Sequence, residues 1–335
     1  MLKLNQIFKN ADVKGEVGIE VEQEFSKHID PLHNDTWTTH QDGSLRNAGY
    51  EFVTRNPVYR GDVHAVLKSL SDFLKPLDKF NDHESPRTSI HIHINTLDLT
   101  PMQVWNQIVA YWLLDSCLVE LCGIYRVTNL FCLRLRDATG LLDIARDELS
   151  AKTPLYRAFN QERIRYASQN LNALSKFNSL EYRAKGGKFD VDSTKNWIEA
   201  LLAIKDKAKE FANPTELLSY YFQVGPNQFA KDFLTYHYYN LVVFNVPKYK
   251  DKMDYNANML IDLVGRTDWD GVIGSKIAAT IKNIATYEAE VARAVPNPAP
   301  RPLRQRRPVP MPRMDGWNPL DAQVAQPAPA QNEEF

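Results

Sequence analysis

Alternation of polar and apolar residues predicts four β-strands in the first part of the chain. β-Branched or aromatic residues recur there with period 2, as in strands that have one buried face. The predicted strands cover residues 16–25, 50–54, 88–95 and 177–183. Four such strands are enough to form one sheet.

Helical periodicity and capping signals predict that the rest of the folded part is helical. Thr100 followed by Pro101 is typical of a helix start, with a capping side chain and a proline in the first turn. The predicted helices cover residues 62–74, 100–122, 141–149, 194–211, 214–222, 227–236 and 273–294. The pattern predicts an α+β fold in which helices back an antiparallel sheet and the second half is mostly helical.

Composition narrows the class of protein. The 335 residues include 40 Lys and Arg against 41 Asp and Glu, so net charge gives no general reason to bind nucleic acid, although a local patch stays open. The most apolar window, 104–122, contains Asp115 and Glu120 and predicts a buried helix, not a membrane span. The three cysteines do not form a disulfide framework, and no secretory leader is recognised. We therefore expect a cytoplasmic protein that does not enter a membrane.

The composition changes sharply near residue 296. Ten of the 19 prolines and five arginines fall in residues 296–335, with few apolar residues between them. Such a segment cannot bury enough apolar surface to fold, which predicts a folded domain over 1–295 and a Pro- and Arg-rich disordered tail over 296–335. Two interpretations stay open for this tail, a solvated extension and a segment that docks a protein partner.

Polar residues of the predicted strands fall on one face of each strand. Period-2 geometry puts alternate side chains on the same side of a sheet. The polar positions are Glu20, Glu22 and Glu24 in the first strand, Glu51 in the second, His91, His93 and Asn95 in the third, and Glu181 and Arg183 in the fourth. Taken alone, the glutamates of the first strand also fit a solvent-exposed strand face, and the two histidines of the third also fit a polar face in which they are hydrogen-bonded. Together, the four runs predict one shared site.

Clustered carboxylates raise one another's pKa unless cations neutralise them, so a shared acidic face indicates bound divalent metal. Oxygen ligands with one imidazole favour magnesium or manganese over zinc. Hard cations held by carboxylates often bind phosphate, which points to nucleoside triphosphate chemistry.

Arginines are the second requirement of a phosphate site. Arg183 is the best placed, because it shares a strand face with Glu181. The other candidates for contact with phosphate are Arg126, Arg134, Arg136 and Arg165. The sequence contains neither a GxxxxGK[ST] loop nor a GxGxxG turn, so P-loop and Rossmann sites are excluded.

Several motifs in a fixed order resemble those of the amidoligase group. That group belongs to the carboxylate–amine ligases related to glutamine synthetase and glutamate–cysteine ligase. The motifs are GIEVE at 18–22, DGSL at 42–45, GYEFVT at 49–54, SIHIHIN at 89–95, RYASQNLNAL at 165–174 and LEYR at 180–183. The resemblance implies that residues 1–295 form an amidoligase-like catalytic domain. Its core would be glutamine synthetase-like, with one face of an antiparallel sheet that binds ATP and two or three magnesium or manganese ions.

The resemblance also implies roles for individual residues. The implied metal ligands are Glu20, Glu22, Glu51, His91 and Glu181. Arg183 corresponds to the arginine that stabilises the transferring phosphoryl group. His93 and Asn95 correspond to positions that hold the nucleotide, and Asn170 and Asn172 to positions that face the site. Among the predicted nucleotide-binding residues we also include Arg136 and Arg165.

These observations predict an ATP-dependent ligase that joins a small-molecule or peptide carboxylate to an amine through an acyl phosphate. Glu24 and Glu51 are candidates for the base that takes the amine's proton. Two alternatives stay open from the sequence. One is a zinc hydrolase that uses His91 and His93, and the other is a non-catalytic scaffold protein that docks a partner through its proline-rich tail.

Overall fold

The computed structural model describes residues 1–9, 14–81, 85–127, 129–138, 140–150 and 152–294. The predicted tail over 296–335 lies outside the described residues. The strands are β1 (Val17–Phe25), β2 (Trp37–Gln41), β3 (Ala48–Thr54), β4 (Ser89–Asn95), β5 (Gln169–Asn170) and β6 (Ser179–Gly186). The α-helices are α1 (Leu4–Phe8), α2 (Val63–Leu74), α3 (Pro101–Leu121), α4 (Ile124–Val127), α5 (Leu141–Ser150), α6 (Asn172–Phe177), α7 (Val191–Ala208), α8 (Pro214–Phe233), α9 (Tyr236–Asn245), α10 (Tyr249–Gly265) and α11 (Trp269–Ala294).

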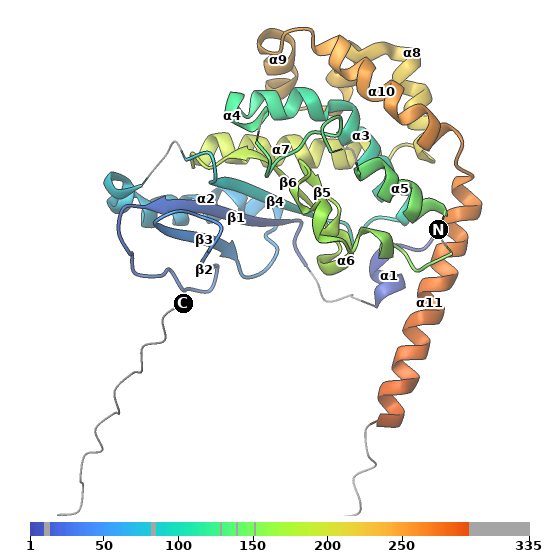
Figure 1. Cartoon of the computed structure of the whole chain (residues 1–335), viewed down its shortest axis with the longest axis horizontal. Coiled ribbons are helices and arrows are strands. Elements are labelled where there is room, and N and C mark those ends of the chain that lie inside the picture. Colours follow the sequence, from blue (N-terminus) through green and yellow to red (C-terminus); the bar gives the residue numbers. More distant parts are fainter. Residues whose placement is uncertain (10–13, 82–84, 128, 139, 151, 295–335) are drawn as a thin grey trace, which may run out of the picture. The chain divides into compact units, whose positions relative to one another are not determined.

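Six strands form one open antiparallel sheet, in the order β2-β3-β1-β4-β6-β5 (Figure 1). The α+β class and the antiparallel sheet are therefore confirmed. The four strands predicted from alternation are β1, β3, β4 and β6. The sequence patterns did not identify β2 or β5, which lie at the two edges of the sheet.

One face of this sheet is apolar and packs against helices. The isoleucines of β4, Ile90, Ile92 and Ile94, have no exposed surface, and neither have Ile19 of β1 and Tyr182 of β6. The helices α3 and α7 contact strands on this side, and α2 packs against α7. The apolar half of each strand is therefore buried, which leaves the opposite face free to carry polar residues.

The long helix α3 lies at the centre of the helical layer. Nearly all of its side chains are buried, as expected for a helix that is apolar all round. Thr100 accepts a hydrogen bond from the Gln103 backbone, and Pro101 occupies the first turn, so the predicted start is confirmed. The helices α7, α8, α9 and α10 pack around it. No helix in the described ranges has the length and apolar character needed to cross a membrane.

Two predicted helices, 214–222 and 227–236, are joined in the structure as the kinked helix α8. Its backbone breaks at Gly225, where φ is +76°, immediately before Pro226. A glycine can adopt this left-handed conformation without strain, and the following proline cannot continue the hydrogen-bond ladder. The patterns missed α9 and α10 entirely, although the prediction of a mostly helical second half is confirmed.

Candidate active site

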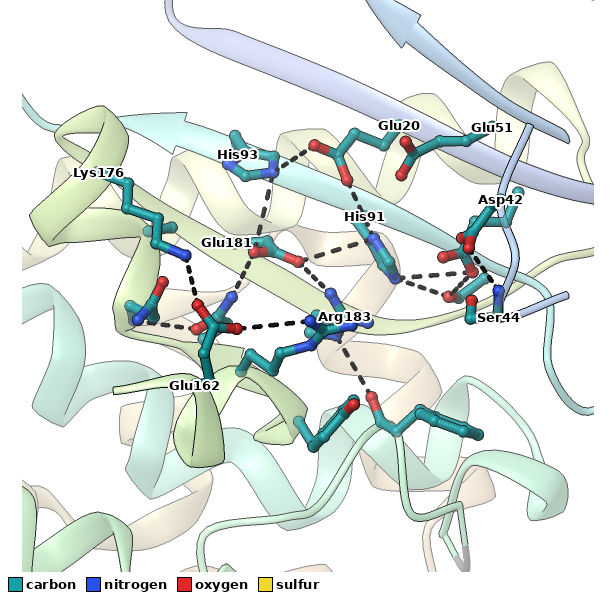
Figure 2. A pocket seen from close by; sticks show the side chains of 18 of the residues that line it. Glu20, Asp42, Ser44, Glu51, His91, His93, Glu162, Lys176, Glu181 and Arg183 are labelled. Atoms are coloured by element: carbon teal, nitrogen blue, oxygen red, sulfur yellow. Dashed lines mark hydrogen bonds and ion pairs between the residues drawn. The ribbon is translucent and has the colours of Figure 1, made fainter. Parts of the chain in front are cut away.

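A cavity of about 240 Å³ opens on the polar face of the sheet (Figure 2). It is bordered by β1, β3, β4 and β6, together with the β2–β3 loop and α6. Of the residues expected from the sequence to form a site, those that line the cavity are Glu20, Glu22, Glu51, His91, His93, Arg165, Asn170, Asn172, Glu181 and Arg183. Side chains up to 163 positions apart in the chain thus meet in one place.

The register of the strands explains this meeting. Because β1 lies between β3 and β4, its acidic residues have polar neighbours on both sides. The opposed pairs are Glu20 with His91, Glu22 with Glu51, and His93 with Glu181. Residues directly opposite in an antiparallel ladder have Cβ atoms only about 5 Å apart.

An irregularity in β6 controls which of its side chains reach the cavity. The β4–β6 register shifts between Ile90 and Ile92, which leaves one extra residue on β6, a β-bulge. Regular alternation would put Lys185 on the same face as Arg183. Instead, Lys185 lies on the helix side, where its Nζ donates to Ser193 Oγ of α7 at 2.8 Å.

Buried Arg126 holds this bulge in place. Its Nε donates to the Ala184 carbonyl at 3.0 Å, and its guanidinium also donates to the Arg183 carbonyl. Arg126, which the sequence offered as a phosphate-binding candidate, therefore contacts backbone and does not line the cavity. Arg183 itself forms an ion pair with Glu181, and its Nε donates to the Phe131 carbonyl at 3.4 Å.

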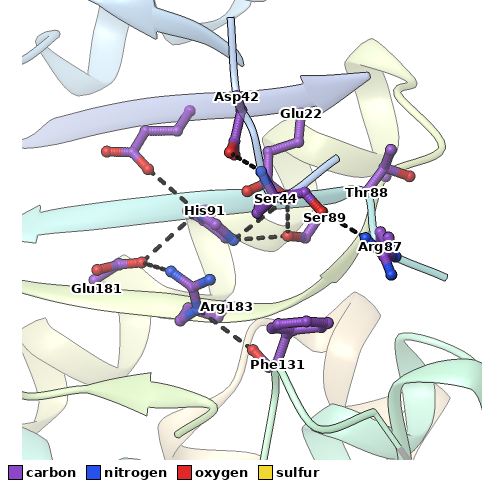
Figure 3. Close-up of polar contacts among 12 residues, drawn as sticks. Glu22, Asp42, Ser44, Arg87, Thr88, Ser89, His91, Phe131, Glu181 and Arg183 are labelled. Atoms are coloured by element: carbon purple, nitrogen blue, oxygen red, sulfur yellow. Dashed lines mark hydrogen bonds and ion pairs between the residues drawn. The ribbon is translucent and has the colours of Figure 1, made fainter. Parts of the chain in front are cut away.

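His91 belongs to two groups of potential metal ligands and lies between Glu22 of one group and Glu181 of the other (Figure 3). One group is Glu20, His91 and Glu181, and the other is Glu22, Glu51 and His91; within each, one ligand atom per residue lies within 4.8 Å of the others. His91 Nδ1 is 3.2 Å from Glu20 Oε2 and 3.7 Å from Glu181 Oε1. His91 Nε2 is 3.9 Å from Glu22 Oε2. In neither group do His91 and His93 occur together.

Burial and neighbouring charges shift the pKa values of the glutamates that line the cavity. Burial, together with the charges of Glu20, Glu22 and Asp42, raises the pKa of Glu51 to about 8. Burial alone would raise the pKa of Glu20, but His93 and His91 outweigh it and hold that pKa well below its usual range. A buried carboxyl that is protonated near neutral pH and has acidic neighbours is a position where a divalent cation would replace the proton.

His93 shows the opposite effect. Burial lowers the pKa of this imidazole, yet the charge and hydrogen bond of Glu20, together with the charge of Glu181, more than offset burial and raise the pKa to about 9. His93 Nε2 is 3.0 Å from Glu20 Oε1, and the His93 Nδ1 atom is 3.1 Å from Ser179 Oγ. At neutral pH His93 therefore carries the positive charge that partly balances the acidic cluster.

The cavity is also lined by residues that the sequence patterns did not assign to the site. They are Asp42, Ser44, Arg87, Ser89, Phe131, Glu162, Tyr166, Ala173, Lys176 and Phe177. Asp42 and Ser44 belong to DGSL, one of the motifs that resemble the amidoligase group. The sequence assigns no role to the residues of this motif. Ser89 lies two residues before His91 on the same strand face, and its hydroxyl is 2.7 Å from His91 Nε2. Period 2 would have identified Ser89, whereas Lys176 and Glu162 carried no strand pattern.

The remaining candidates lie elsewhere. Arg136 is stacked over the Tyr255 ring, 4.9 Å from its centroid, outside the cavity lining. Arg134 donates to Asp137 at 2.6 Å and also lies outside. Asn95 donates to the Gly15 carbonyl at 2.9 Å and lines a neighbouring cavity.

Glu24 shares a strand with Glu20 and Glu22 but does not line the cavity. It is 1% exposed, and its Oε1 accepts a hydrogen bond from the Arg46 backbone at 2.6 Å. Asn170 does reach the site, where its side-chain amide donates to Glu181 Oε2 at 2.5 Å. Of the two candidate bases, Glu51 is thus the one at the cavity.

A family model described as "putative amidoligase enzyme" matches residues 9–205 of the chain. The match covers more than half of the sequence and includes every residue that lines the cavity. No curated protein matches the chain. On the extent of the family match, the chain belongs to the amidoligase family.

Proposed function

We propose that the protein joins a carboxylate to an amine at the expense of ATP. The observation that carries this proposal is the convergence of the four glutamates of the potential ligand groups, His91 and Arg183 on one cavity, in a chain of the amidoligase family. Amide ligation needs a site that binds polyphosphate and activates a carboxylate. Carboxylates that can hold cations, beside a fixed guanidinium, are groups suited to that task.

The donor set fits magnesium or manganese. Each group of potential ligands combines two carboxylates with one imidazole, which suits a hard cation better than zinc. The residues that would hold the ions are Glu20, Glu22, Glu51, His91 and Glu181. Magnesium bound there would neutralise charge on the phosphates of ATP.

The proposed reaction has two steps. A carboxylate oxygen of the substrate attacks the γ-phosphorus of ATP, which forms an acyl phosphate and releases ADP. The amine nitrogen then attacks the acyl carbon, inorganic phosphate leaves, and the nitrogen loses a proton. The first step is needed because a free carboxylate is a poor electrophile. The acyl phosphate carries phosphate as a leaving group, so the amine can attack its acyl carbon.

Two side chains have distinct tasks in this scheme. Arg183 is held by Glu181 and by the Phe131 carbonyl, so its guanidinium is oriented before any ligand binds. It would donate to the oxygens of the transferring phosphoryl group. Glu51 lies at the cavity wall, and a carboxylate oxygen of Glu51 that does not contact a cation is the candidate to take the amine's proton.

The proposal is tested by thermal unfolding with and without ATP and magnesium chloride. A ligand at about 100 times its Kd stabilises a protein by about 2.7 kcal/mol, which for a chain of this size raises the melting midpoint by several degrees. We expect this rise in the wild type and its loss in Glu20→Ala. The control is Glu210→Ala, which removes an exposed partner of Lys207 far along the chain. A wild type that ATP and magnesium do not stabilise would contradict the proposal.

A further inference from the structure

A second cavity, of about 340 Å³, adjoins the acidic one on the same face of the sheet. Glu20, His93 and Phe177 line both cavities, so these three residues form the border between them. The wall of the second cavity is mostly apolar. Its volume lies in the range of about 300–1,000 Å³ that is usual for small-molecule sites.

The alternation of side chains along the strands explains why the surface of the sheet is acidic in the first cavity and mostly uncharged in the second. One step of two residues along each strand leads from a charged residue in the first cavity to a small or neutral one in the second. These steps run from Glu20 to Gly18 in β1, from Glu51 to Val53 in β3, from His93 to Asn95 in β4, and from Glu181 to Ser179 in β6.

Gly18 has a specific part in this change. A Cβ atom at this position would lie 3.2 Å from the Cβ of His93, closer than most such contacts. The absence of a side chain therefore leaves space above the strand. Val53, the residue opposite Glu20 in β3, forms the neighbouring apolar surface.

Positive charge is distributed unequally between the two cavities. Four basic residues line the acidic cavity and not the second one, namely Arg87, Arg165, Lys176 and Arg183. Among the described residues, Arg55 is the only lysine or arginine that lines the second cavity, and it is exposed. The phosphates of a nucleotide would therefore bind in the first cavity, which leaves the second for an uncharged group.

We propose that the second cavity binds the apolar part of the carboxylate substrate and thereby selects it. This inference rests on the proposed function, because the reacting carboxylate must lie at the acidic cavity while the rest of the molecule extends past Glu20 and His93. Phe177, which is 66% exposed and lines both cavities, would cover the hydrocarbon part. A substrate with an aromatic or branched aliphatic side chain fits this arrangement.

The test measures binding of simple carboxylates to the full chain by ligand-detected NMR titration. Acetate and 3-phenylpropionate are compared, both with magnesium chloride and ATP present. We expect the wild type to bind 3-phenylpropionate at least about tenfold more tightly than acetate, because each buried methylene adds to affinity. Val53→Trp fills the cavity and should remove this preference, whereas acetate binding should change little.

Phe177→Ala provides a second variant, since an exposed side chain can be removed without disturbing the core. It should reduce the preference for 3-phenylpropionate several-fold. The matched control is Phe244→Ala, which removes a phenylalanine that is 79% exposed and lines neither cavity. The control should keep the wild-type preference.

Three results would overturn the inference: equal affinity for both carboxylates in the wild type, a preference that survives in both Val53→Trp and Phe177→Ala, or tighter binding of phenethylamine than of 3-phenylpropionate.

The thermal shift with ATP and magnesium separates this inference from the proposed function. A normal nucleotide shift without carboxylate preference would overturn only the inference. An absent nucleotide shift, with the preference intact and sensitive to Val53→Trp, would overturn only the ligase mechanism.

Discussion

His91 is the residue that connects the two groups of potential metal ligands. Its imidazole is 2% exposed, with Nδ1 near Glu20 and Nε2 near the Ser89 hydroxyl. Contacts on both nitrogens fix the orientation of the ring. A ring held in this way presents its lone pair at a defined position, which increases affinity for a metal relative to a freely rotating histidine.

Glu51 provides a prediction about pH. Its pKa of about 8 means that the metal-free protein holds a proton there at neutral pH, and a bound cation must displace it. Loss of this proton should therefore raise the affinity for Mn²⁺ with pH, by up to about tenfold per unit, and this contribution of Glu51 should level off above about pH 8. Titrations followed by electron paramagnetic resonance at pH 6.5, 7.5 and 8.5 would measure this.

The matched variant for this prediction is Glu51→Gln, which keeps the shape of the side chain and removes the titrating group. Its Mn²⁺ affinity should depend less steeply on pH than that of the wild type, and the remaining slope would come from neighbours such as His93. An identical slope in the two proteins would show that Glu51 does not release the proton.

Sequence patterns place strand residues well and loop residues poorly. The glutamates of β1 and the histidines of β4 could be assigned to one face because period 2 fixes the direction of a side chain once the strand is recognised. Asp42, Lys176 and Arg136 lie outside such strands. Their positions depend on how connecting segments fold back over the sheet, which alternation does not encode.

At the scale of elements, the missed strands and helices have identifiable causes. The edge strand β2, with the sequence WTTHQ, buries only Trp37 and Thr39, so its apolar signal is weak. β5 has two residues, too few for any period. Helix α9, YHYYNLVVFN, is rich in aromatic and β-branched residues that favour strands, and it is helical because it is capped by Thr235 and packs on other helices.

A buried ion pair ties α5 to α11 and allows a prediction about stability. Lys276 Nζ lies 3.1 Å from Glu148 Oε1, and both side chains are at most 1% exposed. Glu148 also accepts hydrogen bonds from the Tyr156 and Ala158 backbones. Lys276→Met would leave the carboxylate buried without its cation and should lower the free energy of unfolding by about 3–5 kcal/mol, measured with guanidinium chloride.

Two comparisons make this measurement specific. Adding Glu148→Gln to Lys276→Met should recover part of the loss, since a neutral amide oxygen still accepts a backbone hydrogen bond. Lys207→Met breaks the surface pair with Glu210 and should cost less than about 1 kcal/mol. Equal costs for Lys276→Met and Lys207→Met would refute the assigned role of the buried pair.

At the scale of the whole chain, both cavities and the buried core come from the part before the proline-rich segment. Among the described residues, those that line the two cavities lie between positions 18 and 183, and the last residue of the buried apolar core is Ile273. A chain that ends after Ala294 should therefore keep the melting midpoint within about 1 °C. It should also keep the stabilisation by ATP and magnesium, measured in the same experiment.

A shorter chain that ends after Asp268 is the control, because it loses the buried Lys276 and Ile273 and should melt at a clearly lower temperature. If removal of residues 295–335 alone abolished the nucleotide effect, the ligand site would have to include residues from that segment.

The bulge in β6 has a consequence for the comparison of homologous chains. It absorbs one extra residue between Glu181 and the Gly186–Gly187 turn, so a homologue with a regular strand would be one residue shorter there. A one-residue alignment gap is thus expected at Ala184. An alignment that matched the glycines without this gap would pair Glu181, a potential metal ligand, with a buried apolar residue of the other protein.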